Sequence, residues 1–154
     1  MGLDMYLTVE KYFGGYGDEA GRNAILANIG PDIPPMSRAS GSATVSFEAA
    51  YWRKANAVHG WFVDNVQGGE DDQGRHYVPL DDLKGLVALC ENIVAGGDPD
   101  DLPPVAGFFF GPTDDASWYL DYLQLTVDQL KPLIEWFDAD DSRSCWDIYY
   151  QASW

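Results

Sequence analysis

The stretch LDMYLTVEKYF, residues 3–13, decides the fold. Leu3, Met5, Leu7 and Val9 are apolar, and they alternate with Asp4, Tyr6, Thr8 and Glu10. Because successive side chains of a β-strand point to opposite faces, this period of two predicts a strand with one apolar face and one solvated face. The segment is also rich in β-branched and aromatic residues, which favours a half-buried strand.

Three later segments are also predicted to be strands. They are ATVSFEA at 43–49, a short run around RHYVPL at 75–80, and the aromatic end CWDIYYQASW at 145–154, which is expected to lie against the first strand. Residues 14–42 are loaded with Gly, Pro, Asn and Ser around one apolar island at 24–29. This part is predicted to be a long irregular excursion with one or two helical turns.

Helical spacing of apolar residues appears in three places. Residues 50–67 fit one helix, residues 81–95 fit a second that Gly96 and Gly97 end, and residues 114–138 fit either one kinked helix or two helices. The uncertainty in the last segment comes from Pro132 and from Thr126 with Gln129, which resemble a capping box. Residues 98–106 are predicted to be an acidic connection, and residues 107–111 a short apolar strand or buried turn.

Length and composition indicate one globular domain over residues 1–154. The chain is 46% hydrophobic and 14% aromatic, so it can bury a core. We therefore expect an α+β fold in which a small, mainly antiparallel sheet, including the N- and C-terminal strands, is packed by two to four helices.

Charge is the strongest feature of the composition. The chain has 25 Asp and Glu against nine Lys and Arg, a net charge of -16. Such a field repels phosphate backbones and anionic lipids and attracts a basic protein surface. The expected partner is therefore a basic protein, such as a nucleic-acid-binding complex, rather than nucleic acid or membrane. The alternative is that the charge serves only solubility or reflects a salt-adapted host.

The location expected from these patterns is the reducing compartment in which the protein is made. No run of 18 or more apolar residues exists, and the start of the sequence lacks the basic and apolar parts of a signal peptide. The two cysteines, Cys90 and Cys145, are too few for a disulfide framework, which agrees with a reducing compartment.

Common catalytic and metal signatures are missing from the sequence. Gly15, Gly17 and Gly21 miss the dinucleotide-binding spacing, and neither a phosphate loop nor a nucleophile elbow is present. The histidines and cysteines lack zinc-ligand spacing, and the acidic runs at 98–101 and 138–141 lack the Gly and Glu of a calcium loop. We therefore predict no catalytic residue, no metal and no cofactor.

His59 is the most unusual position. On a helix over 50–67 its titratable ring points into the apolar face, so it needs a hydrogen-bond partner or must stay neutral. It is either a satisfied core residue or part of a pocket, whereas Trp61 is expected to point away from that face as a contact residue. The candidate binding residues are Trp52, Arg53, Asn56, His59, Trp61, Asp71, Asp72, Asp98, Asp100 and Asp101.

Three segments carry a family resemblance: MGLDMYL at 1–7, YWRKANAVHGWFVDNVQ at 51–67 and GFFFG at 107–111. Together they resemble a family of short uncharacterised bacteriophage and prophage proteins. The resemblance implies a small accessory protein of a mobile element that acts in a bacterial cytoplasm. It implies no activity for any residue.

These observations leave three functional hypotheses. The first is a non-enzymatic accessory protein that binds a basic host protein through its acidic surface, as an inhibitor of a nucleic-acid-handling defence complex such as a CRISPR effector would. The second is a nucleotide-like small-molecule site or enzyme around His59, and the third is a virion or assembly component. Carboxylates clustered on one face favour the first, a pocket at His59 the second, and a large exposed apolar patch the third.

Overall fold

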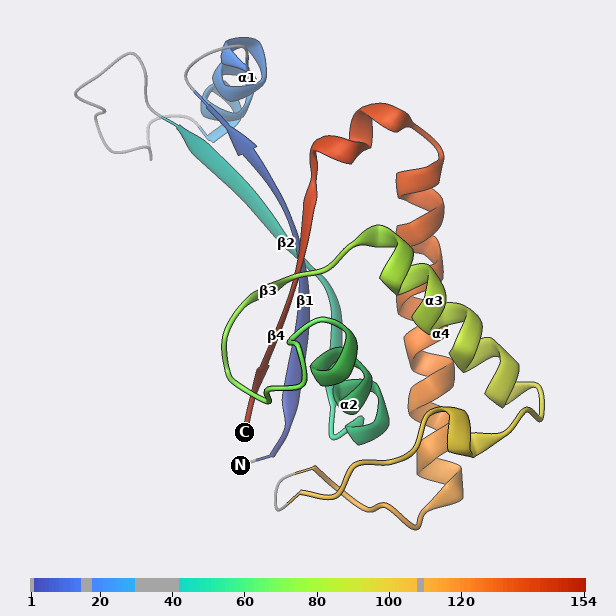
Figure 1. The fold of residues 1–154 in the computed structure, drawn as a ribbon. Helices are drawn as coiled ribbons and strands as arrows, with labels where there is room; N and C mark the ends of the chain where they lie inside the picture. Colours follow the sequence, from blue (N-terminus) through green and yellow to red (C-terminus); the bar gives the residue numbers. More distant parts are fainter. Residues whose placement is uncertain (1, 15–17, 30–41, 108–109) are drawn as a thin grey trace.

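The computed structural model describes residues 2–14, 18–29, 42–107 and 110–154 (Figure 1). Strands and helices alternate irregularly along this part of the chain. In order they are β1 (Asp4–Phe13), α1 (Glu19–Ile29), β2 (Ala43–Arg53), α2 (Asn56–Asn65), β3 (His76–Tyr77), α3 (Leu80–Val94), the 3-10 helix Pro99–Asp101, α4 (Ala116–Asp138), the 3-10 helix Asp141–Cys145 and β4 (Asp147–Ser153).

The strands form one antiparallel sheet in the order β2-β1-β4-β3. The strand predicted at residues 3–13 is central, and its Asp4 pairs with Ser153 of the last strand. The expected α+β fold, with N- and C-terminal strands side by side in a small antiparallel sheet, is therefore confirmed.

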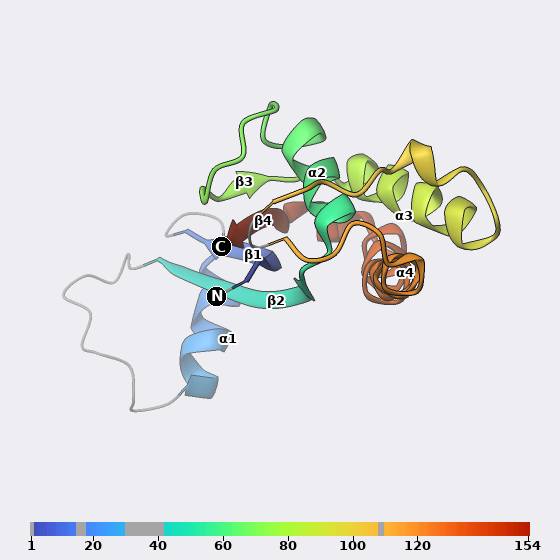
Figure 2. The same ribbon diagram turned by 90° about the horizontal axis from the view of Figure 1, so that it is seen from below.

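One face of the sheet carries the core. Met5 and Leu7 of β1, Trp52 of β2 and Tyr150 of β4 are fully buried. Helices α2, α3 and α4 cover this face, as two views at right angles show (Figures 1 and 2). The alternation seen in the sequence therefore marks the boundary between the core and the opposite side of the sheet.

We call the opposite side the open face. Strand register sets its side chains in rows, with Tyr6 between Tyr51 and Gln151, Thr8 between Glu48 and Tyr149, and Glu10 between Ser46 and Asp147. Tyr77 of β3 extends the middle row because it pairs with Tyr149. Polar and tyrosine side chains thus occupy neighbouring positions on all four strands.

The predicted helix over 50–67 is wrong in its first part. Residues up to Arg53 continue β2, and α2 begins only at Asn56. In the strand, Ala50 and Trp52 are buried while Tyr51 and Arg53 are exposed. Pairing with β1 outweighs the helical spacing of these four residues, and Lys54, at φ 59°, turns the chain from strand to helix.

Helix α1 is longer than the one or two turns expected for residues 14–42. It follows β1 and lies near the far end of the β1 and β2 strands (Figure 1). Gly21 closely approaches Phe13 there, since an added Cβ would lie 3.0 Å from the Phe13 ring. Residues 15–17 and 30–41 of the predicted excursion lie outside the described residues.

Helices α3 and α4 pack against each other on the core side. The predicted helix at 81–95 is confirmed, and burial raises the pKa of its core thiol, Cys90, to about 12. Residues 116–138 form one helix with an exposed Pro132 inside it. Thr126 is not a cap, because it lies in mid-helix and its hydroxyl donates to the Tyr122 carbonyl at 2.7 Å.

The segment at 107–111 is partly described. Phe110 is buried, and its amide donates to the Gly107 carbonyl at 3.1 Å, which makes a turn. Residues 108–109 of the predicted strand or turn lie outside the described residues. Within the described ranges, no helix combines the length and apolar character needed to cross a membrane.

Candidate functional site

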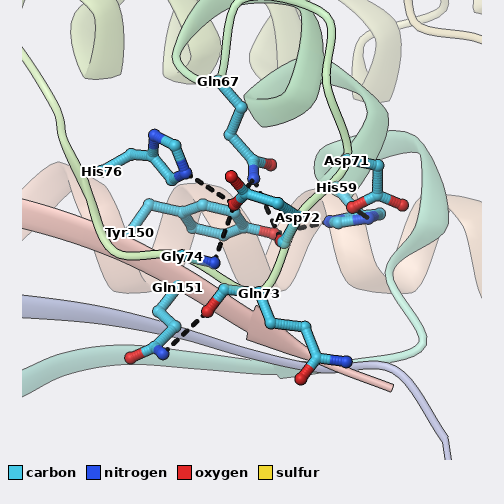
Figure 3. Close-up of polar contacts among 9 residues, drawn as sticks. All are labelled: His59, Gln67, Asp71, Asp72, Gln73, Gly74, His76, Tyr150 and Gln151. Carbon is cyan, nitrogen blue, oxygen red and sulfur yellow. Dashed lines mark hydrogen bonds and ion pairs between the residues drawn. The ribbon is translucent and has the colours of Figure 1, made fainter.

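His59 of α2 lies at the centre of a buried polar cluster (Figure 3). Its side chain is 1% exposed, which confirms its predicted position on the apolar face. Nδ1 lies 2.7 Å from the Tyr150 hydroxyl, and Nε2 lies 3.1 Å from Asp71 Oδ1. The cluster therefore joins helix α2, the central strand β4 and the turn after α2.

Burial sets the protonation of this cluster. It raises the pKa of Tyr150 well above the ordinary value, so the hydroxyl stays protonated. The Asp71 carboxylate beside Nε2 favours the ring proton on that nitrogen, which assigns Nδ1 as the acceptor of the Tyr150 hydroxyl. Burial also lowers the pKa of His59, and the negative charge of Asp71 acts in the opposite direction. Asp71 lies off the direction of the Nε2–H bond, so its contact is electrostatic rather than a well-aligned hydrogen bond.

Aromatic rings surround the imidazole of His59. Phe110 packs edge-on with ring centroids 5.0 Å apart, and Trp154 lies at 5.7 Å. Protein groups thus occupy both ring nitrogens and the ring faces. A general acid or base must reach its substrate directly or through one water, so a ring enclosed in this way is better suited to fixing structure than to catalysis.

The turn after α2 is held rigidly on the sheet. We call residues 68–74 the acidic loop. Asp72 Oδ1 accepts from Gly74 N at 2.7 Å, lies 2.7 Å from His76 Nε2 and accepts from Gln67 at 3.2 Å (Figure 3). The His76 contact is the main cause that lowers the pKa of Asp72. The Gln73 carbonyl accepts from Gln151 at 2.9 Å, so the loop is tied to β4 as well.

Asn56 is a buried connector rather than a surface contact. Its amide donates to the Pro112 carbonyl at 3.0 Å and the Phe110 carbonyl at 3.4 Å. Its side-chain oxygen accepts from the Tyr122 hydroxyl at 3.2 Å. Asn56 therefore fixes the segment that covers His59.

The other candidates from residues 50–67 separate in space. Trp52 is fully buried and donates from Nε1 to Thr126 Oγ1 at 2.9 Å, so it is a core residue. Arg53 is 60% exposed, and its Nε lies 3.8 Å from Asp4 Oδ1. Trp61 is half-buried and packs against the core, with its ring edge-on to Phe62. The prediction that Trp61 points away from the apolar face as an exposed contact residue is therefore wrong. The sequence grouped these residues only because it placed them on one helix.

Two acidic segments meet at the start of α4. We call Asp98, Asp100, Asp101, Asp114 and Asp115 the acidic corner; all five are exposed. Between them lies a pocket of about 240 Å³ whose lining includes Pro99, Pro104, Ala116 and Tyr119. The Tyr119 hydroxyl donates to the Leu102 carbonyl at 2.9 Å and holds the two segments together.

Electrostatics mark the acidic corner as negative. Burial raises the pKa of Tyr119 to about 12, and Asp100 and Asp101 add to that rise. The sequence identified Asp98, Asp100 and Asp101 but not Asp114 and Asp115, because the two segments are adjacent only after folding.

The acidic loop and the acidic corner do not share one face. The loop lies beside β3 and β4, whereas the corner lies beyond the far end of α3, on the opposite side of α2 in both views (Figures 1 and 2). Asp71 and Asp72 are also engaged within the protein by His59 and His76. The corner is therefore the larger cluster of carboxylates open to a partner.

Sequence reasoning missed an apolar groove. It has a volume of about 260 Å³, and Phe47, exposed to 58%, lies at its rim. Its lining residues come from both sheet and helix: Val9, Phe47, Ala49, Leu133, Trp136 and Trp146. The signal in the sequence was Phe47 in a predicted strand, but the strand alone did not show which side chains would join it.

The described ranges contain no candidate metal site. There, no group of three or more His, Cys, Asp or Glu side chains converges to hold an ion.

Comparison with known proteins gives no relative: no family model, curated protein or solved structure matches the chain. The acidic corner and the apolar groove are therefore the features of this chain that bear on its function.

Proposed function

We propose that this protein is a binding domain, not an enzyme, whose acidic surface engages a basic host protein. The observation that supports this most is the acidic corner, where five exposed carboxylates gather and two of them, Asp114 and Asp115, line a mainly apolar pocket. Such a pocket suits a Lys or Arg side chain, which buries its aliphatic stem on apolar surface and keeps its charged end among carboxylates.

The distribution of cations supports the same proposal. Four basic residues already pair with carboxylates of the chain: Arg53 with Asp4, Arg75 with Glu10, Lys84 with Asp138 and Lys131 with Glu91. In the described ranges, no ion pair reaches the acidic corner. Its charge is thus available to attract a basic partner, and that attraction will weaken as salt screens it.

The specific form of the proposal is inhibition of a nucleic-acid-handling defence complex. A protein groove that holds DNA or RNA is lined by Lys and Arg, and an acidic surface competes for it. The net charge of -16 and the resemblance to phage proteins support this form.

The apolar groove favours a second candidate, a virion or assembly component. Exposed apolar surface between β2 and α4 is typical of a site that another protein covers. On this alternative the contact is made by Phe47 and its neighbours and does not weaken with salt.

Affinity purification with matched variants tests the proposal. The immobilised protein is incubated with host lysate at about 50 mM and about 500 mM salt, and the retained proteins are identified by mass spectrometry. We expect retention of a basic protein that is lost at high salt and in the triple variant Asp100→Asn, Asp101→Asn, Asp114→Asn. The control, Asp18→Asn, Asp64→Asn, Glu135→Gln, removes equal charge elsewhere.

The outcomes separate the two candidates. Equal retention by the corner variant and the control would overturn the role of the acidic corner. Retention that persists at high salt and is lost in Phe47→Ser would support the assembly candidate instead.

A further inference from the structure

The open face of the sheet already binds one guanidinium group of its own chain. The Arg75 Cζ atom lies 3.8 Å from the centroid of the Tyr149 ring, and Arg75 Nη2 lies 2.6 Å from Glu10 Oε1. The hydrogen bond from Arg75 is the main cause that lowers the pKa of Glu10. One tyrosine ring and one carboxylate together hold this guanidinium group.

The strand register brings a second tyrosine ring and carboxylate close together on the same face. Tyr149 lies opposite Thr8, and Glu10 is two residues further along β1, so ring and carboxylate are diagonal neighbours on adjacent strands. On the other side of β1, Glu48 lies opposite Thr8, and Tyr6 is two residues back along β1. Tyr6 and Glu48 are therefore diagonal neighbours with the same relative direction from ring to carboxylate, but a β-bulge after Leu7 lies between them.

In the described part of the chain, no cation stacks on Tyr6 or pairs with Glu48, and Arg53, which lies near Tyr51, is paired with Asp4. There, stacked cations lie on Phe13, Tyr149 and Trp136, and no ion pair involves Glu48. Tyr51 enlarges the aromatic surface, since its ring centroid lies 5.4 Å from that of Tyr6. Glu48 and Tyr51 are both exposed, so a side chain from outside can reach them.

We propose that the open face, at Tyr6, Tyr51 and Glu48, binds the guanidinium group of an arginine in a basic partner protein. This inference rests on the proposed function, because it names the side chain that such a partner presents. Arginine fits better than lysine because its planar group stacks on a ring while its N–H groups reach a carboxylate, whereas an ammonium is a compact, strongly hydrated charge.

Charge on the same face argues against nucleic acid as the occupant. Glu10, Glu48 and Asp147 lie in adjacent rows, and they repel phosphate groups. Aromatic rings on a sheet often stack on bases, but here the carboxylates select a cation.

The first experiment compares two short peptides, one of alternating arginine and glycine and one of alternating lysine and glycine. Binding to the full chain is measured by calorimetry at low salt. We expect the arginine peptide to bind several-fold more tightly. Glu48→Gln should weaken its binding about fivefold, the size of one exposed cation contact, whereas Glu135→Gln should change it little. Equal binding of both peptides, or equal losses in the two variants, would overturn the inference.

The second experiment uses the internal site as a standard. Arg75→Ala vacates the Tyr149 and Glu10 site, so methylguanidinium should raise the thermal midpoint of this variant more than methylammonium does. Arg143→Ala is the matched control, because Arg143 stacks on Trp136 and, among the described residues, forms no direct ion pair with a carboxylate, although Asp140 is near. The same small shift for both ions in both variants would show that a ring and a carboxylate at this spacing do not select guanidinium.

These measurements separate the inference from the proposed function. A salt-sensitive partner that depends on the acidic corner but is indifferent to Glu48→Gln would leave the proposed function standing and overturn the inference. Selective arginine binding at Glu48 without any corner-dependent partner would do the reverse.

Discussion

At the scale of single residues, His59 is a titratable ring that the fold buries almost completely. Both of its ring nitrogens lie against polar groups of the protein. Its partners, Tyr150 and Asp71, come from a distant strand and from the following loop, so no local pattern identified them. Trp52 was a candidate binding residue on the same predicted helix, but it is a buried strand residue that bonds to Thr126.

The protonation of His59 leads to a prediction about pH. Its folded-state pKa lies below the unfolded value of about 6.5, so the unfolded state binds the proton more readily and stability falls as the pH drops through that value. Asp71→Asn removes the charge that opposes this effect. We expect a steeper loss of unfolding free energy between about pH 7.5 and about pH 5, toward a limit of about 2 kcal/mol.

Urea unfolding at the two pH values measures this loss. Asp64→Asn, an exposed change of the same charge on helix α2, which also carries His59, is the control and should keep the original pH dependence. A pH dependence in Asp71→Asn that is no steeper than in the original protein would show that Asp71 does not stabilise the charged form of His59.

At the scale of elements, the sequence predicted what local periodicity controls. The alternation in residues 3–13 and the apolar spacing in 81–95 were sufficient, because each pattern matches only one kind of structure. Residues 50–53 fitted both a helix and a strand, and pairing of Trp52 with Met5 across the sheet decided between them. The sequence identified the acidic run at 98–101 as part of the candidate site. It did not identify the carboxylates at 114–115, because they come close to that run only through tertiary contacts.

The contact between β2 and α4 leads to a prediction about stability. The buried indole N–H of Trp52 donates to Thr126 Oγ1. Thr126→Val keeps the shape but removes the acceptor, so the unfolding free energy should fall by about 1–3 kcal/mol, the cost of an unpaired buried donor. Thr126→Ser keeps the hydroxyl and should keep the hydrogen bond, which indole fluorescence and urea unfolding would verify. A larger loss in Thr126→Ser than in Thr126→Val would mean that the methyl group matters more.

At the scale of the whole molecule, charge opposes folding. A net charge of -16 on a chain of 154 residues repels itself more strongly when compact than when unfolded. We therefore expect the unfolding free energy in urea to rise when salt increases from about 20 mM to about 200 mM, since the screening length shortens over that range.

The acidic corner should contribute part of this effect. The triple variant Asp100→Asn, Asp101→Asn, Asp114→Asn should be more stable at low salt and should gain less from added salt. The same gain in the variant and the original protein would place the repulsion elsewhere on the surface.

The pairing of the first strand with the last has a mechanical consequence. Asp4 lies beside Ser153, so the beginning of β1 and the end of β4 are neighbours at the same end of their pairing. These two strands are also the central strands of the sheet. A force that pulls these ends apart loads the hydrogen bonds between β1 and β4 one pair at a time, like a zipper, rather than all together in shear. Traction on both ends, as an unfolding motor or a force probe applies it, would therefore split the sheet along its midline at low force, with β2 and β3 each left on a separate half.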